Sequence, residues 1–193
     1  MFTIYHSNQL ELLKSLTAAL IERDPLESVF TKEVVLVQSK GMAQWLQIQL
    51  AEEFGISANI DFILPANFIW HTYTCVLPDI PENNPFDKDA MSWKLMQILP
   101  ELIEHAEFRI LKKYISKDNR ERKFYQLATR IADLFDQYLV YRPEWIATWE
   151  KGEHVSGLES SQEWQAPLWQ ALVEYNKSLG LPHSHRANIY QRF

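Results

Sequence analysis

The sequence lacks the features that define secreted proteins, membrane-spanning proteins and proteins that cover nucleic acid by positive charge. It holds one cysteine, Cys75, in 193 residues, so an internal disulfide is excluded. It has neither a basic-then-apolar N-terminal segment nor a run of about 18 apolar residues, the marks of a signal peptide and of a transmembrane helix. Its net charge of −6 disfavours a protein that covers nucleic acid by bulk positive charge. We therefore expect a cytoplasmic protein with no membrane partner.

Motifs of known enzyme chemistry are also missing. No HExxH, GxSxG or CxxC pattern occurs, and the P-loop pattern GxxxxGKS/T is absent. We therefore expect no catalytic residue. His183 and His185 have a spacing that can hold a metal, but two histidines in a proline-flanked loop without a nearby third ligand are usually polar surface residues. We expect no metal ion.

The clearest structural signal lies at residues 34–50. Four apolar, mostly β-branched residues predict a buried strand, and a helical pattern follows without a break. The turn between them holds Ser39, Lys40 and Gly41, where a P-loop protein carries its phosphate-cradling glycines and its Lys-Ser/Thr pair. Gly41 is the only glycine here, and Lys40 precedes it instead of following it. The pattern indicates a nucleotide-binding scaffold without the nucleotide chemistry.

The order of predicted elements favours an α/β fold, with a small parallel sheet and a mostly helical subdomain. A loop rich in proline and asparagine at residues 78–85 ends the sheet-containing part, which gives domains at 1–85 and 86–193. The chain stops at Phe193 without the polar tail common at natural ends, so we expect it to be truncated. Strands are predicted at residues 2–5, 34–37 and 58–63, and helices at 10–23, 66–77, 91–99, 101–114 after a break at Pro100, 120–141, 144–149 and 161–179.

The predicted helix at residues 120–141 has an apolar and a polar face. At about 100° per residue, Asp133 and Asp136 point away from the expected core, and Leu134 lies at the edge of the apolar face. Carboxylates can accept hydrogen bonds from the amino groups of bases, but such residues are also common as solvated surface groups. Trp70 presents a similar choice between stacking on a base in a groove and packing in the core. The residues alone leave both alternatives open.

Seven unusual strings run through the chain from end to end. They are YHSN at residues 5–8, LVQSKGMAQWL at 36–46, ANIDF at 58–62, MSWKLM at 91–96, ADLFDQYLVYRPEW at 132–145, WQAPLW at 164–169 and HRANIYQRF at 185–193. Together they closely resemble the N-terminus of the RecC family, the gamma chains of bacterial exodeoxyribonuclease V. The resemblance covers this whole chain but only the first part of the family's much longer one.

The resemblance implies the fold of a superfamily 1 helicase whose ATPase motifs have decayed, in agreement with the incomplete P-loop. It also implies a heterotrimer with RecB and RecD that binds DNA ends and single-stranded DNA. The partner subunits would use ATP and magnesium, so no cofactor is expected in this chain. The surface with which the family reads the Chi sequence corresponds here to Gln38, Gln44, Leu64, Trp70, Asp133, Leu134, Asp136, Arg142 and Arg186.

Two positions depart from the family's pattern. Lys40 replaces a small hydroxyl residue and Gln137 replaces a carboxylate, so we expect a different Chi-like sequence or a steeper salt dependence of binding. Two hypotheses follow for this chain: a non-catalytic, sequence-reading DNA-binding part of a helicase–nuclease complex, or a structural module that docks the partner subunits without reading DNA. Trp70 and Asp136 distinguish them. An open groove favours DNA reading, whereas burial or internal pairing favours docking.

Overall fold

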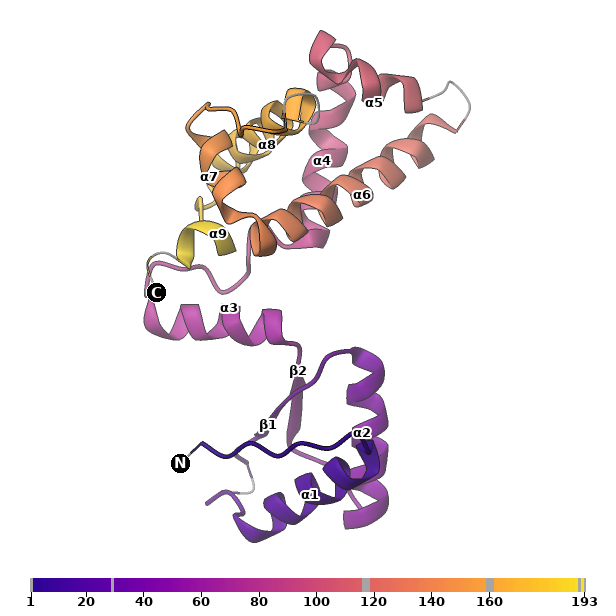
Figure 1. Ribbon diagram of the computed structural model, residues 1–193, viewed down its shortest axis with the longest axis vertical. Helices are drawn as coiled ribbons and strands as arrows, with labels where there is room; N and C mark the ends of the chain where they lie inside the picture. Colours follow the sequence, from indigo (N-terminus) through magenta and orange to yellow (C-terminus); the bar gives the residue numbers. More distant parts are fainter. Residues whose placement is uncertain (1, 29, 116–118, 159–161, 191, 193) are drawn as a thin grey trace. The chain divides into compact units, whose positions relative to one another are not determined.

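The computed structural model describes residues 2–28, 30–115, 119–158, 162–190 and 192 (Figure 1). The chain divides into two compact units, residues 1–71 and residues 72–193, with the division inside a helix. We call them unit 1 and unit 2 and describe each by itself. The two domains expected from the sequence, with their boundary at residue 85, stay a prediction.

Unit 1 is built from alternating helices and strands. Its elements are α1 (Leu10–Arg23), β1 (Glu33–Leu36), α2 (Lys40–Phe54), β2 (Ile60–Ile63) and the beginning of α3 (Pro65–Val76). The two strands pair in parallel, with Glu33 opposite Ile60 and Leu36 opposite Ile63 (Figure 1). The helix α2 connects them, as a parallel pair requires.

One face of this small sheet is covered and the other is open. Val35 packs against a cluster centred on Ala18 of α1 and Leu46 and Leu50 of α2. Val34 and Leu36 alternate with it along β1 and are 53% and 49% exposed. Because successive side chains of a strand point to opposite faces, the two helices shield only the face that carries Val35.

Unit 2 consists of helices and the loops that join them, with no strand among its described residues. Its elements are α4 (Lys88–Leu102), the 3-10 helix η1 (Ala106–Phe108), α5 (Arg109–Tyr114), α6 (Arg120–Tyr141), α7 (Pro143–Glu150), α8 (Gln162–Ser178) and α9 (Arg186–Ile189). The long helices α4 and α6 pack on each other, and α8 packs on α4 and α7 (Figure 1). Their contact surfaces bury the large side chains of Phe86, Phe135, Trp149 and Trp169 in one core.

Helix α6 follows from its sequence pattern. Phe124, Ala128, Ile131 and Phe135 recur every three or four residues, and all four are buried. Their side chains therefore form one stripe on the helix, which packs into the core of unit 2. The predicted bounds of 120–141 are confirmed.

The predicted α/β class is only partly confirmed, because the chain is mostly helical and its sheet has two strands. The strand predicted at residues 2–5 is wrong. That segment lies outside any helix or strand, and its Phe2 and Ile4 are exposed. A strand requires a neighbour to complete its backbone hydrogen bonds, and none of the described residues supplies one to this segment.

The predicted break at Pro100 is also wrong, because α4 continues through it to Leu102. Pro100 lies in the last turn, and the amide of Ile103 still donates to the carbonyl of Leu99 at 2.9 Å. Met91 and Leu95, one turn apart, are fully buried. Packing of this face offsets the loss of a single backbone hydrogen bond at the proline.

None of the helices in the described part of the chain combines the length and the apolar character needed to cross a bilayer.

Candidate functional site

The turn between β1 and α2 retains the strand–turn–helix geometry of a phosphate-binding loop. Ser39 is the N-cap of α2, and its hydroxyl accepts a hydrogen bond from the amide of Met42 at 3.1 Å. That bond occupies one of the amides that would face a phosphate. A Cβ built on Gly41 would meet only the Ser39 hydroxyl, at 3.7 Å, so glycine is not required by close packing at this position.

A pocket of about 220 Å³ lies at the carboxyl ends of β1 and β2. Lys40 lines it, but so does the carboxylate-bearing Asp61, together with the apolar Leu64. A carboxylate opposes binding of a phosphate, because like charges repel. The pocket therefore keeps the position of a nucleotide site in an α/β fold but not its charge.

Of the predicted reading residues, four lie in unit 1. Gln38 and Gln44 flank the turn and are exposed, so their amides face solvent. Leu64 is half-buried at the end of β2. Trp70, in α3, is only 7% exposed, so its ring is not available on an open surface.

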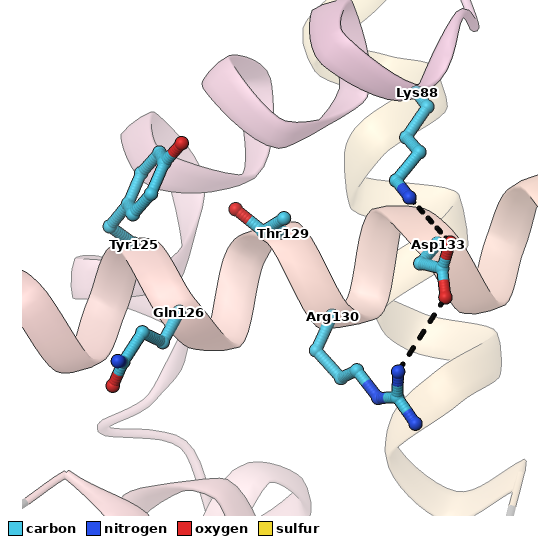
Figure 2. A pocket seen from close by; sticks show the side chains of 6 residues that line it. All are labelled: Lys88, Tyr125, Gln126, Thr129, Arg130 and Asp133. Carbon is cyan, nitrogen blue, oxygen red and sulfur yellow. Dashed lines mark hydrogen bonds and ion pairs between the residues drawn. The ribbon is translucent and has the colours of Figure 1, made fainter. Parts of the chain in front are cut away.

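In unit 2, Asp133 on α6 pairs with cations on both sides. Its carboxylate lies 2.5 Å from Nζ of Lys88 on α4, and its second oxygen lies 3.7 Å from the guanidinium of Arg130 (Figure 2). The hydrogen bond from Lys88 lowers the pKa of Asp133. Asp133 is therefore held ionised, as a base-contacting carboxylate must be.

Asp136 lies one turn further along α6 and pairs with Arg186, the first residue of α9, at 3.0 Å. Burial raises the pKa of Asp136, and the charge of Arg186 offsets this only in part. The Nε atom of Arg186 is buried without a hydrogen-bond partner among the described residues. The fold thus brings together two predicted reading residues that are 50 positions apart in the sequence.

The last two predicted residues, Leu134 of α6 and Arg142 directly after its end, differ in exposure. Leu134 is half-buried, in agreement with its predicted place at the edge of the apolar face. Arg142 is exposed, and its guanidinium lies over the ring of Trp145, 5.4 Å from the centroid. Its Nη1 also donates to the carbonyl of Tyr141 at 2.9 Å, so the stacking and this hydrogen bond together orient the guanidinium.

A cluster of polar side chains that the sequence analysis did not connect lies at the end of α7. One carboxylate oxygen of Glu150 is 2.9 Å from Nε2 of His185 and 3.3 Å from Nε2 of His183. The same oxygen accepts a hydrogen bond from the indole N–H of Trp169 at 3.1 Å. Burial alone would raise the pKa of Glu150, but the hydrogen bonds and charges of the two histidines outweigh it and hold the pKa at about 2.

The expectation that both histidines are polar surface residues is wrong for His185, which is 1% exposed. Burial lowers its pKa, so its ring favours the neutral form. The ring also caps α9, because its Nδ1 accepts the amide of Asn188 at 3.3 Å. The cluster was missed because Glu150 stands 35 positions before His185, and local spacing carries no signal of that contact.

The three side chains Glu150, His183 and His185 place their ligand atoms within 4.8 Å of one another, which is close enough to surround a metal ion. The hydrogen bonding argues against that use. Since Nδ1 of His185 accepts a backbone amide, the ring proton is on Nε2, which donates to Glu150. A metal would bind Nε2 only in its unprotonated form, which places the ring proton on Nδ1. Nδ1 could then no longer accept the amide that caps α9. The arrangement instead fits an internal anchor that holds α9 against α7.

Comparison with known proteins shows the family to which the chain belongs. The family described as "RecC, N-terminal domain" matches residues 2–193. The chain is 55% identical over 193 residues to the RecBCD enzyme subunit RecC of Escherichia coli and 45% identical over 213 residues to that of Haemophilus influenzae. Both matches cover all of this chain but only 17% and 19% of the relative.

A more distant relative is similar over most of the chain. The RecBCD enzyme subunit RecC of Mycobacterium tuberculosis strain H37Rv is 26% identical over 186 residues, covering 88% of this chain and 16% of the relative. The chain therefore spans less than a fifth of the length of these curated relatives.

Proposed function

The chain belongs to the RecC family and matches the N-terminal domain of that family. We therefore propose that it works as part of a RecC subunit in a RecBCD-type enzyme. Its partners in that assembly are RecB and RecD, and its substrates are DNA ends and the single strands made from them. The process served is repair of double-strand breaks by homologous recombination, in the cytoplasm. The name shared by its relatives supports the assembly.

Within the assembly this part of the subunit is non-catalytic, with the fold of a superfamily 1 helicase that has lost its ATPase motifs. The turn at Ser39, Lys40 and Gly41 supports this, since it lacks a phosphate-cradling glycine run and has Asp61 in the adjacent pocket. ATP and magnesium are then used by the partner subunits alone. ATP turnover by the purified chain that is abolished by Lys40→Ala would contradict this assignment.

The DNA-contacting part is the surface of α6 around Asp133 and Asp136, together with Arg186. The observation that carries the proposal is that the Asp136–Arg186 pair is only partly buried and incompletely satisfied, because Nε of Arg186 has no hydrogen-bond partner among the described residues. A carboxylate accepts from the amino group of cytosine, and a guanidinium donates two hydrogen bonds to guanine. If the Asp136–Arg186 ion pair opens when a single strand binds, each of the two side chains can contact a base instead of the other. An acidic protein can read sequence in this way.

The test uses the full-length protein assembled with its partner subunits. Binding to a single strand with a Chi-like sequence is compared with binding to the same bases in scrambled order, for the wild type and for Asp136→Asn. Each base contact contributes about 1–3 kcal/mol, so we expect the affinity ratio to fall at least about fivefold in the variant. Asp24→Asn, an exposed carboxylate paired with Arg23 in unit 1, is the matched control. An unchanged ratio in Asp136→Asn would remove base reading from this surface.

A second candidate is a docking module that holds RecB or RecD and reads no DNA of its own. Two observations favour it: the ring of Trp70 is buried, and Asp136 is already paired within the chain. In that case Asp136→Asn leaves the sequence preference intact but weakens co-purification of the partner subunits. The same set of proteins therefore separates the two candidates.

A further inference from the structure

A pocket of about 270 Å³ opens on the surface of unit 2, beside the residues discussed so far. Tyr125, Thr129 and Asp133 line it from one row of α6, and Gln126 and Arg130 line it from the neighbouring row, at the spacing of successive helical turns (Figure 2). Lys88 of α4 closes it on the side of Asp133. Among these residues only Asp133 belongs to the predicted reading surface.

An exposed aromatic pair borders the pocket. The rings of Tyr125 on α6 and Trp93 on α4 have their centroids 6.1 Å apart and are tilted by 48°. Both are largely exposed, at 49% and 63%, whereas Trp149 and Trp169 of the same unit are fully buried. Large aromatic side chains exposed together on a surface are suited to stacking on another flat ring.

The polar groups of the pocket are only partly used. The hydroxyl of Thr129 is buried without a hydrogen-bond partner among the described residues. Lys88 and Arg130 both pair with Asp133, so the residues that line the pocket carry two positive charges and one negative charge. Asp89 and Asp136 also act on Lys88, which leaves Arg130 as the cation that can meet an anion. The guanidinium of Arg130 is 85% exposed and its contact with Asp133 is long, at 3.7 Å, so it remains available to an anion.

Arg122 extends the positively charged surface along α6, beyond Arg130. Arg122, Gln126 and Arg130 follow one another at intervals of four residues, and all three are exposed. The two arginines are therefore about 12 Å apart along the axis, at 1.5 Å per residue. That distance exceeds the separation of neighbouring phosphates in a single strand, so Arg122 and Arg130 can contact phosphates that are more than one nucleotide apart.

A flat ring, hydrogen-bonding edges and a negative charge are the properties of a nucleotide. We propose that this pocket binds one nucleotide of single-stranded DNA, with its base stacked on Tyr125 beside Trp93, its edge at the amide of Gln126 and its phosphate at Arg130. Stacking serves every base, so the pocket grips the strand without selecting sequence, next to the surface that reads it. The inference rests on the proposed function, because it takes the same strand as its ligand.

The test measures binding of two oligonucleotides to the full-length protein in its assembly: a thymidine strand and the same strand with abasic sites. Replacing the ring in Tyr125→Leu should weaken binding of the thymidine strand about fivefold or more and leave the abasic strand unaffected. Tyr125→Phe keeps the ring and should match the wild type. Equal loss for both strands, or no loss for either, would overturn the stacking.

Arg130→Gln provides an independent variant, because the side chain is exposed and its replacement leaves the core untouched. It should lower the slope of log affinity against log salt by about 1 and keep the ratio between the two strands. Lys177→Gln, an exposed cation of α8, is the control. A slope equal to that of the control would remove the phosphate contact.

Two further outcomes separate this inference from the proposed function. If Asp136→Asn abolishes sequence preference while Tyr125→Leu and Arg130→Gln leave binding unchanged, the proposed base reading is supported and the nucleotide pocket is overturned. If Tyr125→Leu releases RecB or RecD during purification, the aromatic pair is a protein interface and the nucleotide pocket is overturned. If the wild type distinguishes neither thymidine from abasic strands nor one sequence from another, both proposals fail.

Discussion

The two units of this chain differ in how completely they bury their apolar side chains. Unit 2 encloses large rings such as Phe135 and Trp169 at full burial, with helices packed around them. The cluster of unit 1 centres on Ala18, Leu46 and Leu50, and its sheet leaves Val34 and Leu36 exposed. Free energy of folding scales with the apolar area removed from water, so unit 2 should be the more stable part of the chain.

The difference also concerns how polar groups are held. In unit 2, several buried or half-buried polar groups have partners from distant elements: Lys94 of α4 bonds to Asn176 of α8, and Glu150 of α7 bonds to His185. In unit 1 the residues around the β1–α2 turn are exposed and their chemistry is local. Substitutions in the two units should therefore differ strongly in cost, which the following predictions test.

The largest effect is expected for Trp169→Ala in unit 2. Its ring lies within 5.4 Å of Phe86 and 5.3 Å of Phe135, centroid to centroid, and is fully buried. Removal of such a ring costs about 3–5 kcal/mol of unfolding free energy. Trp45→Ala, at a half-buried tryptophan of unit 1, should cost clearly less. Urea unfolding of both variants, followed by circular dichroism, measures the difference, and equal costs would contradict it.

The next effect is a loss of stability in acid, which should originate in unit 2. The pKa of Glu150 is about 2 in the folded chain, against an ordinary value of 4.5. The unfolded chain thus binds more protons between these values, so the stabilisation is complete above about pH 4.5 and is lost as the pH falls through 2. The difference corresponds to roughly 3 kcal/mol. Burial lowers the pKa of His185, so its contribution has the same sign and starts to fall near its ordinary value of 6.5.

Glu150→Gln tests the source of this acid sensitivity, because the amide keeps the shape but cannot ionise. We expect a loss of about 2 kcal/mol at pH 7 and a flatter stability profile between pH 2 and 4.5. Thermal unfolding across that range measures both. Glu174→Gln, whose exposed carboxylate pairs with Lys177, should behave as the wild type. A full acid transition in Glu150→Gln would place the sensitive group elsewhere.

A smaller effect is expected for two glycines of unit 1, Gly41 in the first turn of α2 and Gly55 directly after its end. Gly55 ends the helix at φ 77°, where a side chain is strained, so Gly55→Ala should cost about 1 kcal/mol. Gly41 lies in the first turn with space for a Cβ, so Gly41→Ala should be neutral or stabilise by up to about 1 kcal/mol. Unfolding free energies of the two variants check this. Destabilisation by Gly41→Ala would show that the turn still needs glycine.

The smallest effect is expected on the open face of the sheet. Val34→Thr should change the unfolding free energy by less than about 0.5 kcal/mol, because its side chain is already in water. Val35→Thr, on the covered face, places a hydroxyl among apolar groups and should cost roughly 1 kcal/mol. Hydrogen exchange of β1 in the two variants resolves the difference. Equal protection in both would mean that neither face is covered in solution.

Much of the fold followed from local patterns. The pattern of Phe124, Ala128 and Ile131 was sufficient to identify α6, and its bounds were predicted correctly. The expected strand at residues 2–5 and the break at Pro100 failed for the same reason. A strand forms only beside a neighbouring strand, and the effect of a proline depends on how its helix packs. A short window of sequence shows neither the neighbouring strand nor the packing.

The candidate site divides in the same way. The strand, turn and helix around Ser39, Lys40 and Gly41 were predictable because they depend on consecutive residues, whereas the interpretation of the turn as an incomplete P-loop stays a prediction. The polar direction of Asp133 and Asp136 followed from helical geometry, but their partners Lys88 and Arg186 did not. The residues that the resemblance assigns to DNA reading stay predictions until the substitutions above are measured.

The sequence by itself determined the features whose causes are local, namely the helix periodicity and the strand–turn–helix of unit 1. It also determined membership of the RecC family. Only the tertiary structure decided which charges meet. Asp136 and Arg186 lie 50 positions apart, and Glu150 and His185 lie 35 apart, so their contacts exist only once the helices of unit 2 pack. The physical reason is that periodicity fixes the face of a helix on which a side chain lies, whereas burial of the apolar faces fixes what lies opposite it.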